Sequence, residues 1–300
     1  MERYNRLNEF LKEKFGERVL KISVDGGFSC PNRDGTKGLR GCAFCTGLGS
    51  GDHLKHSLSI KEQIDAHIES YRGERANKFI VYFQSFSNTY APLHKLKQKY
   101  DEALSSSNKI VGLAVATRPD LINEEIARLL SSYNDKYYVS VELGLQTANN
   151  TTLENLNVKY SSSDFSKAVQ ILNKYNIDVV AHIMVGLPGE THSDIINTIN
   201  FLNSNNISGV KIHSTYVAKG TELEKLFQNW NYSPLSLEEY IEEAVYIITH
   251  LNKNVVIHRI SGDAPKDLLV APIWNKNKKP IMNGIHKVLE ERNLFQGMYN

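Results

Sequence analysis

Segments of strand length and segments of helical spacing alternate along nearly the whole of this 300-residue chain. Each strand-like segment is short, apolar and poor in charge, and the segments between them carry apolar residues three or four positions apart. Buried strands that alternate with amphipathic helices predict a parallel sheet with helices packed on it. The predicted strands are 19–24, 79–83, 110–116, 137–143, 177–185 and 209–217, with 255–260 as a candidate seventh.

Six or seven such units predict an α/β fold whose sheet curls into a barrel or partial barrel. A doubly wound open sheet remains the alternative, because the period of the pattern does not separate the two. Capping boxes that begin at Ser59 and Ser236 mark two helix starts, and Gly16 ends an opening helix. No clear linker divides the chain. We therefore expect a single domain over 1–300, with its core at about 17–260 and a C-terminal extension at about 261–300.

Hydropathy argues against a membrane protein, and charge leaves the partner open. No apolar run approaches the roughly 18 residues of a spanning helix, and the charged N-terminus lacks the apolar core of a signal peptide. We therefore expect a cytoplasmic protein. The formal net charge of +2 neither requires nor excludes a nucleic-acid partner.

All three cysteines lie in one glycine-rich loop after the first predicted strand. Cys30, Cys42 and Cys45 have the spacing C-x11-C-x2-C, and their odd number argues against a disulfide framework. Closed iron–sulfur and structural zinc sites take four protein ligands, whereas three thiolates leave one metal position open for a cofactor. This favours a cluster with an open iron. The alternatives are a zinc site with His53 or His56 as fourth ligand, and free or redox-active thiols.

The residues around these cysteines resemble a known family. The stretches Cys30-Pro31-Asn32-Arg33-Asp34-Gly35 and Gly41-Cys42-Ala43-Phe44-Cys45 resemble radical S-adenosylmethionine (SAM) enzymes, and within them the YhcC/YtqA-type branch related to the Elongator catalytic subunit. The resemblance covers roughly positions 3 to 295. It implies a partial (β/α)6 barrel of the TIM type with N- and C-terminal helical extensions, a [4Fe–4S] cluster on Cys30, Cys42 and Cys45, bound SAM, and a reducing electron donor.

Further segments that match the family follow the predicted strands, where a barrel places its chemistry. The amine of SAM is expected near the second strand, and its ribose and sulfonium near the third to fifth. A tight turn after the fifth strand is expected to approach the adenine. The cofactor-binding candidates are Gln84, Ser85, Thr117, Arg118, Glu142, Gln146, Lys159, His182, Gly186 and Leu187, and the catalytic candidates are Lys211 and His213.

Several of these residues have purely structural alternatives. Glu142 could pair with Arg118, His182 could be a satisfied core histidine, and 186–189 could be an ordinary turn. Lys211 and His213 lie two apart on a strand, so they share one face, which we expect to be the barrel interior rather than the helical layer.

The chain departs from the family pattern at one position. Val158 stands where an arginine usually meets the SAM carboxylate. The neighbouring Lys159 offers a point charge there, but it cannot form a bidentate fork.

The resemblance also implies a substrate class. Members of the YtqA branch are implicated in converting a 5-carboxymethylaminomethyl group on the tRNA wobble uridine into a 5-aminomethyl group, so tRNA is the expected partner. The alternatives are a radical SAM enzyme with another substrate, and a non-catalytic zinc or iron–sulfur module. Near the C-terminus, Trp274, Phe295 and Tyr299 could stack on RNA bases or serve ordinary packing.

Overall fold

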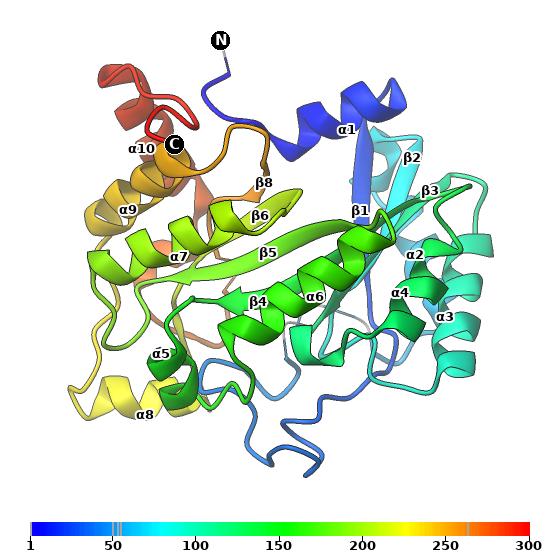
Figure 1. Ribbon diagram of the computed structural model, residues 1–300, viewed down its shortest axis with the longest axis horizontal. Helices are drawn as coiled ribbons and strands as arrows, with labels where there is room; N and C mark the ends of the chain where they lie inside the picture. Colours follow the sequence, from blue (N-terminus) through cyan, green and yellow to red (C-terminus); the bar gives the residue numbers. More distant parts are fainter. Residues whose placement is uncertain (1, 50, 53, 55, 263) are drawn as a thin grey trace.

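The computed structural model describes residues 2–49, 51–52, 54, 56–262 and 264–300. These residues form a curled sheet of seven parallel strands that pair largely in chain order (Figure 1). A doubly wound sheet would reverse its strand order at a switch point, so that alternative is wrong. The strands are β1 (Val19–Val24), β2 (Lys78–Phe83), β3 (Ile110–Thr117), β4 (Tyr138–Gln146), β5 (Asp178–Val185), β6 (Gly209–Ser214) and β8 (Val256–Arg259).

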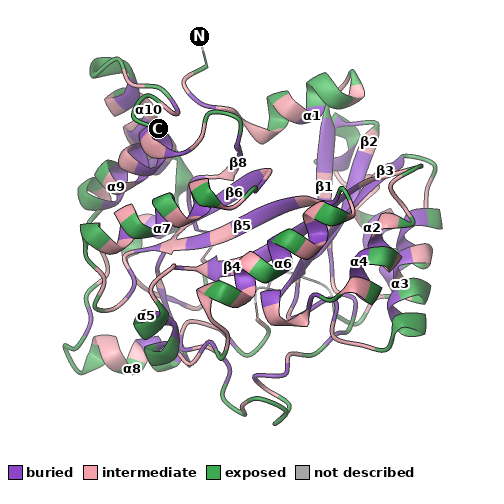
Figure 2. Ribbon diagram, viewed as in Figure 1, coloured by how far each residue is buried: buried purple, intermediate pink, exposed green. Residues whose placement is uncertain are grey.

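Amphipathic helices cover one face of this sheet, and the main hydrophobic core lies between the two layers. Figure 2 shows the sheet largely buried and the covering helices exposed on their outward sides. The capping boxes at Ser59 and Ser236 are confirmed. These helices are α2 (Ile60–Ile68), α3 (Leu93–Ser105), α4 (Glu124–Ser131), α6 (Ser162–Lys174), α7 (His192–Ser204) and α9 (Leu237–His250).

Three further helices lie at the two ends of the sheet. α5 (Asn150–Asn155) and α8 (Glu222–Gln228) lie near the cysteine loop, whereas α10 (Lys278–Glu291) packs on α9 toward the opposite end (Figure 1). Short 3-10 helices occur at Gly73–Arg75, Pro119–Leu121 and Ile273–Lys276. Every helix in the described ranges falls short of the length and apolar character needed to cross a bilayer.

The opening helix α1 (Leu7–Phe15) packs against the inner face of the sheet, on the side away from the other helices. Its buried Leu11 joins a second apolar cluster with Val19, Ile80 and Ala114. Just before α1, the Asn5 carbonyl accepts a hydrogen bond of 2.8 Å from the Ile257 amide of β8. The N-terminal segment therefore covers the edge that β8 would otherwise expose, which is the usual need of an unclosed sheet.

Five of the six predicted strands are confirmed with small shifts of their ends, and β8 is the candidate seventh. The prediction of one strand over 209–217 is wrong. β6 ends at Ser214 because its neighbour β5 ends at Val185, where Gly186 turns the chain with a φ of 81°. The next two residues that extend, β7 (Val217–Ala218), pair instead with β9 (Leu269–Ala271) in a separate antiparallel ribbon.

A buried hydroxyl on α3 offers a test of this packing. The Tyr100 side chain is fully buried, and its hydroxyl donates to the Asn88 carbonyl in the loop after β2. Replacement by phenylalanine leaves that carbonyl without its donor, which costs about 1–3 kcal/mol. We expect Tyr100→Phe to lower the urea midpoint accordingly, while Tyr71→Phe, at a side chain that is 82% exposed, leaves it unchanged. Equal midpoints for the two variants would contradict this account.

Candidate functional site

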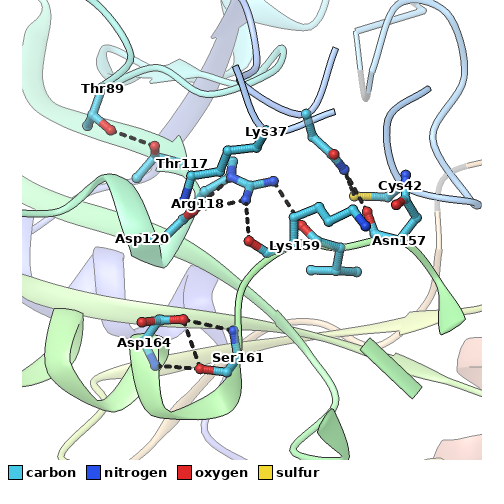
Figure 3. Close-up of polar contacts among 12 residues, drawn as sticks. Lys37, Cys42, Thr89, Thr117, Arg118, Asp120, Asn157, Lys159, Ser161 and Asp164 are labelled. Atoms are coloured by element: carbon cyan, nitrogen blue, oxygen red, sulfur yellow. Dashed lines mark hydrogen bonds and ion pairs between the residues drawn. The ribbon is translucent and has the colours of Figure 1, made fainter. Parts of the chain in front are cut away.

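The cysteine loop follows β1 and is joined to the loop after α5 by three hydrogen bonds. The Asn32 side-chain amide donates to the Asn157 carbonyl at 2.7 Å, and the Asn157 side-chain amide donates to the Gly41 carbonyl at 2.7 Å. The Ala43 amide donates to the Leu156 carbonyl at 2.9 Å. Two loops more than a hundred residues apart in sequence therefore form one wall at the carboxyl ends of the strands (Figure 3).

Two of the three thiols are close enough to interact. The interaction between Cys42 and Cys45 raises the pKa of Cys42 and lowers that of Cys45. The Asn32 side-chain amide also lies 3.6 Å from the Cys42 sulfur as a donor. Cys30 and Cys42 are both close enough to the Arg118 guanidinium to feel its charge. All three cysteines are partly exposed and free of disulfides.

This arrangement is compatible with a cubane cluster. In the part of the chain that the structure describes, no three His, Cys, Asp or Glu side chains are placed to hold one metal ion. A cubane cluster binds each thiolate at a different iron, so its ligands need not converge on one point. Of the two proposed zinc ligands, His53 lies outside the described residues. The ring nitrogens of His56 already meet the Asp25 carboxylate at 2.7 Å and the Gly51 carbonyl at 3.0 Å.

Arg118, directly after β3, anchors the loop that faces the cysteines. Its Nε and Nη2 atoms each bond an Asp120 carboxylate oxygen at 2.9 Å. Its Nη1 and Nη2 atoms donate to the carbonyls of Val158 at 3.0 Å and Lys159 at 3.2 Å. The alternative that Glu142 pairs with Arg118 is therefore wrong. A contact between Arg118 and SAM stays a prediction, and most of the guanidinium N–H groups are already engaged.

Glu142 forms the centre of a polar network on the inner face of the sheet. Its carboxylate is fully buried and bonds Lys21 of β1 at 2.7 Å, His182 of β5 at 2.7 Å, and Lys211 of β6. Burial alone would raise the pKa of Glu142, but the two lysines hold it well below its ordinary value. A buried charge persists only when it is paired in this way.

The two catalytic candidates lie on the inner face, as predicted. Lys211 contacts Glu142 and the Tyr82 hydroxyl, the latter at 3.2 Å, and burial lowers the pKa of Lys211 to about 7. The His213 ring lies 5.3 Å from that of His182, and its Nε2 atom is buried without a hydrogen-bond partner among the described residues. Burial lowers the pKa of His182 to about 4 and that of His213 well below its ordinary range.

The candidates beside β2 and β3 differ in whether their side chains already have hydrogen-bond partners. The Gln84 side-chain oxygen accepts from the Ser23 hydroxyl at 3.1 Å. The neighbouring Ser85 hydroxyl is fully buried and finds no partner within the described ranges, as expected of a group that awaits a ligand. The Thr117 hydroxyl instead meets that of Thr89 at 2.6 Å (Figure 3). Their contacts with SAM stay predictions.

The candidates after β4 and β5 lie around a small apolar cluster. Leu187 and Val158 are buried in it together with Ala43, next to Cys42. The carbonyl of Gly186 accepts a hydrogen bond of 2.7 Å from the Tyr232 hydroxyl. Gln146 ends β4 with a φ of 67°, a left-handed conformation that is uncommon for a side-chain-bearing residue and often marks functional sites.

Lys159 is exposed, although it directly follows the buried Val158 of this cluster. It also has a positive φ, of 65°, and its side chain is exposed and lines a groove on the outer side of the cysteine loop. Val158, at the position of the usual arginine, is instead fully buried. A contact between Lys159 and the SAM carboxylate remains a prediction.

Sequence reasoning missed several members of the inner network. Lys21 binds Glu142, and the Tyr82 hydroxyl binds Lys211. Lys21 also lies 3.5 Å from the His258 ring of β8. A signal existed for Lys21, because it is the one charge within an otherwise uncharged strand, 19–24. No local pattern identifies Asn32 and Asn157, whose roles arise only when their loops meet. Trp274 serves ordinary packing, which was the alternative to stacking on RNA: its indole N–H donates to the Leu235 carbonyl at 3.0 Å.

The buried lysine predicts a pH-dependent stability. The pKa of Lys211 is about 7 in the folded protein, against an ordinary value of 10.5. Between these values the unfolded chain binds the extra proton, so the free energy of unfolding rises with pH, by at most about 1.4 kcal/mol per pH unit. We expect Lys211→Met to lose this rise in urea titrations, and Lys61→Met, at a side chain that is 59% exposed, to keep it. Identical pH profiles for wild type and Lys211→Met would refute the assignment.

Comparison with known proteins finds family matches over most of the chain. Residues 35–202 match the Radical SAM superfamily, and residues 207–291 match the Radical_SAM C-terminal domain. YtqA of Bacillus subtilis is 35% identical over 99% of this chain and 93% of its own length. YhcC of Escherichia coli K12 is 36% identical over 94% of this chain and 90% of its own length.

The solved structures agree in fold. The archaeal Methanocaldococcus infernus Elp3 with an N-terminal deletion has a TM-score of 0.71 at 20% identity, over 93% of this chain and 64% of that one. At that identity the likeness shows the fold alone. Together with the sequence matches, these findings place the chain in the radical SAM superfamily, in its YhcC-type group related to Elongator, as an enzyme whose cofactors are a [4Fe–4S] cluster and S-adenosylmethionine.

Proposed function

We propose that Cys30, Cys42 and Cys45 hold the cluster and that the enzyme modifies the wobble uridine of tRNA, converting its 5-carboxymethylaminomethyl group into a 5-aminomethyl group. One observation carries the proposal. The cysteine loop lies at the carboxyl ends of the strands, and the same strands carry a buried Lys–Glu–His network on their inner face. Cofactor and substrate groups therefore share one enclosed face of the protein.

The cysteine loop has the features that a cluster needs. Its thiols are partly exposed, its glycines allow a tight path, and the Asn32 amide already points at the Cys42 sulfur. When bound, the cluster would supply one electron for the cleavage of SAM into methionine and a 5′-deoxyadenosyl radical, and this radical would take a hydrogen atom from the substrate. The buried Ser85 hydroxyl has no hydrogen-bond partner among the described residues, so it is suited to accept from the amine of SAM.

The inner network is suited to holding a substrate and moving protons. Lys211 uses two of its three N–H groups on Glu142 and Tyr82, which leaves one for a substrate oxygen. Because its pKa is about 7, its Nζ atom exchanges a proton near neutral pH. The buried Nε2 atom of His213 offers a further polar contact. Glu142 acts through these groups, since it holds Lys211 and His182 in place.

The substrate class rests on relatives and on chemistry. A tRNA uridine(34) acetyltransferase of Methanocaldococcus infernus is 29% identical over 66% of this chain and 36% of its own length. The proposed substrate carries a secondary amine next to a carbon–hydrogen bond and ends in a carboxylate. Abstraction of a hydrogen atom from the carbon between that nitrogen and the carboxylate, followed by return of one electron to the cluster, would leave an imine. Water would hydrolyse this imine to the 5-aminomethyl group and glyoxylate, and Lys211 is a cationic partner for the carboxylate.

Substitution of one cysteine tests the cluster. We expect Cys42→Ala to lose iron, sulfide and the brown absorbance after anaerobic reconstitution, and to form no 5′-deoxyadenosine from SAM. The loop lies outside the main core, so the free energy of unfolding of the apoprotein should fall by no more than about 1 kcal/mol. Ser29→Ala, at an exposed loop position, is the matched control and should bind the cluster normally. A colourless wild-type protein with one tightly bound zinc ion would overturn the assignment.

Nucleoside analysis tests the substrate. Reconstituted enzyme with SAM, a reductant and tRNA that carries 5-carboxymethylaminomethyluridine should yield the 5-aminomethyl nucleoside. Lys211→Met should cut this product at least about a hundredfold, which is the lower range of a lost acid–base group, while cluster content stays normal. Production of 5′-deoxyadenosine without any change in the nucleoside would show a radical SAM enzyme that acts on another substrate.

A further inference from the structure

A groove with a cationic lining runs beside the cysteine loop, outside the barrel. Residues 35–40 form one wall, and Asn157 and Lys159 form the other, around a space of about 460 Å³. Three of the lining side chains are cations, Lys37, Arg40 and Lys159, and the lining contains no acid. Such a lining favours an anionic occupant.

The cations of the groove differ in how far they are neutralised. Lys37 binds Asp120, whose other contact is Arg118 (Figure 3), so its charge is largely compensated. Arg40 and Lys159 are exposed, and neither side chain has a hydrogen-bonded acid among the described residues. Glu222 is near enough to Arg40 to feel its charge, but its carboxylate bonds Lys225 at 2.7 Å. Two cations therefore remain available to a ligand.

The walls of the groove are held in place from beneath. The Arg118 guanidinium donates to the Lys159 carbonyl at 3.2 Å, and the paired Asn32 and Asn157 amides join the two walls. The Asn32 amide that holds the Asn157 carbonyl also approaches the Cys42 sulfur, at 3.6 Å. Whatever occupies the groove is thus anchored next to the cysteines at the mouth of the barrel.

The shape of the groove suits a strand of nucleic acid. A small-molecule site is usually enclosed and largely apolar, whereas this groove is open and bordered by glycines, a threonine and cations. A docking protein contacts about 20–30 residues on each partner, whereas eight residues line this groove. A phosphodiester backbone needs only spaced cations and a channel, and the 78% exposed Leu39 offers an apolar contact for a sugar or base.

We propose that this groove binds the phosphate backbone of the RNA substrate through Arg40 and Lys159, so that a neighbouring nucleotide reaches the mouth of the barrel. This inference rests on the proposed function and adds the surface that positions the RNA. Phosphate contacts fix register without reading sequence, so the effect of these residues is the same for RNAs of different sequence.

The salt dependence of RNA binding tests the proposal. Fluorescence anisotropy of a labelled RNA hairpin is measured with the anaerobic holoenzyme at several salt concentrations. Each of Arg40→Gln and Lys159→Gln should lower the slope of log affinity against log salt by about 0.7, and the double variant by about 1.4. Arg40→Lys keeps the charge and should keep the slope. The control is Lys12→Gln with Lys287→Gln, two exposed lysines on α1 and α10 at the opposite end, which should leave the slope unchanged.

Two outcomes would overturn the proposal. One is a double variant with the slope of the wild type. The other is a double variant that binds RNA normally but accepts electrons poorly from an acidic redox protein such as reduced flavodoxin, which would make the groove a protein-docking site. Binding needs no turnover, so its result is independent of the proposed reaction. If RNA binds through the groove but no nucleoside changes, the proposed reaction is wrong, whereas the assignment of the groove as an RNA-binding surface still holds.

Discussion

The buried Glu142 carboxylate and its two lysines are the interaction on which the shape of the inner face depends. In a flat sheet the backbones of β1 and β4 would lie about 14 Å apart, at three strand spacings, and side chains on one face would stand parallel. Lys21 of β1 could not then reach Glu142 of β4. The structure brings Lys21 and Lys211, from distant strands, to the same carboxylate. Only a sheet curled about that carboxylate allows this, and an unpaired Glu142 at zero exposure would be costly.

The same closure sets the chemistry of the site. Curling removes the inner face from water, and burial is the largest influence on the lowered pKa values of Lys211, His182 and His213. Near neutral pH the two histidines of the network are therefore largely uncharged, and Lys211 is populated in both its protonated and its neutral form. An enclosed face also protects a reactive intermediate from solvent. The burial of the inner face thus both stabilises the curled sheet and shifts the pKa values of the groups on it.

The loop after α5 shows how one substitution redirects neighbouring groups. At the position of the usual arginine, Val158 joins the apolar cluster beside Cys42, and Arg118 binds the carbonyls of Val158 and Lys159 from below. With its backbone held and its φ positive, Lys159 presents its side chain to the outer groove. The positive charge of Lys159 therefore lies at an outer surface. Arg118 supplies the cation that acts on Cys30 and Cys42.

The periodicity of the sequence was enough to predict most of the strands and helices and the shared face of Lys211 and His213, because these follow from local spacing and from the burial of apolar faces. The three cysteines and their motif were likewise sufficient for the family. Only the tertiary structure decided which groups meet: Glu142 with Lys21 rather than Arg118, Asn32 with Asn157, and Val217 with β9 rather than β5. Pairings of this kind depend on the curvature of the sheet and the path of long loops, and no local pattern of residues encodes the distance between positions that lie a hundred residues apart.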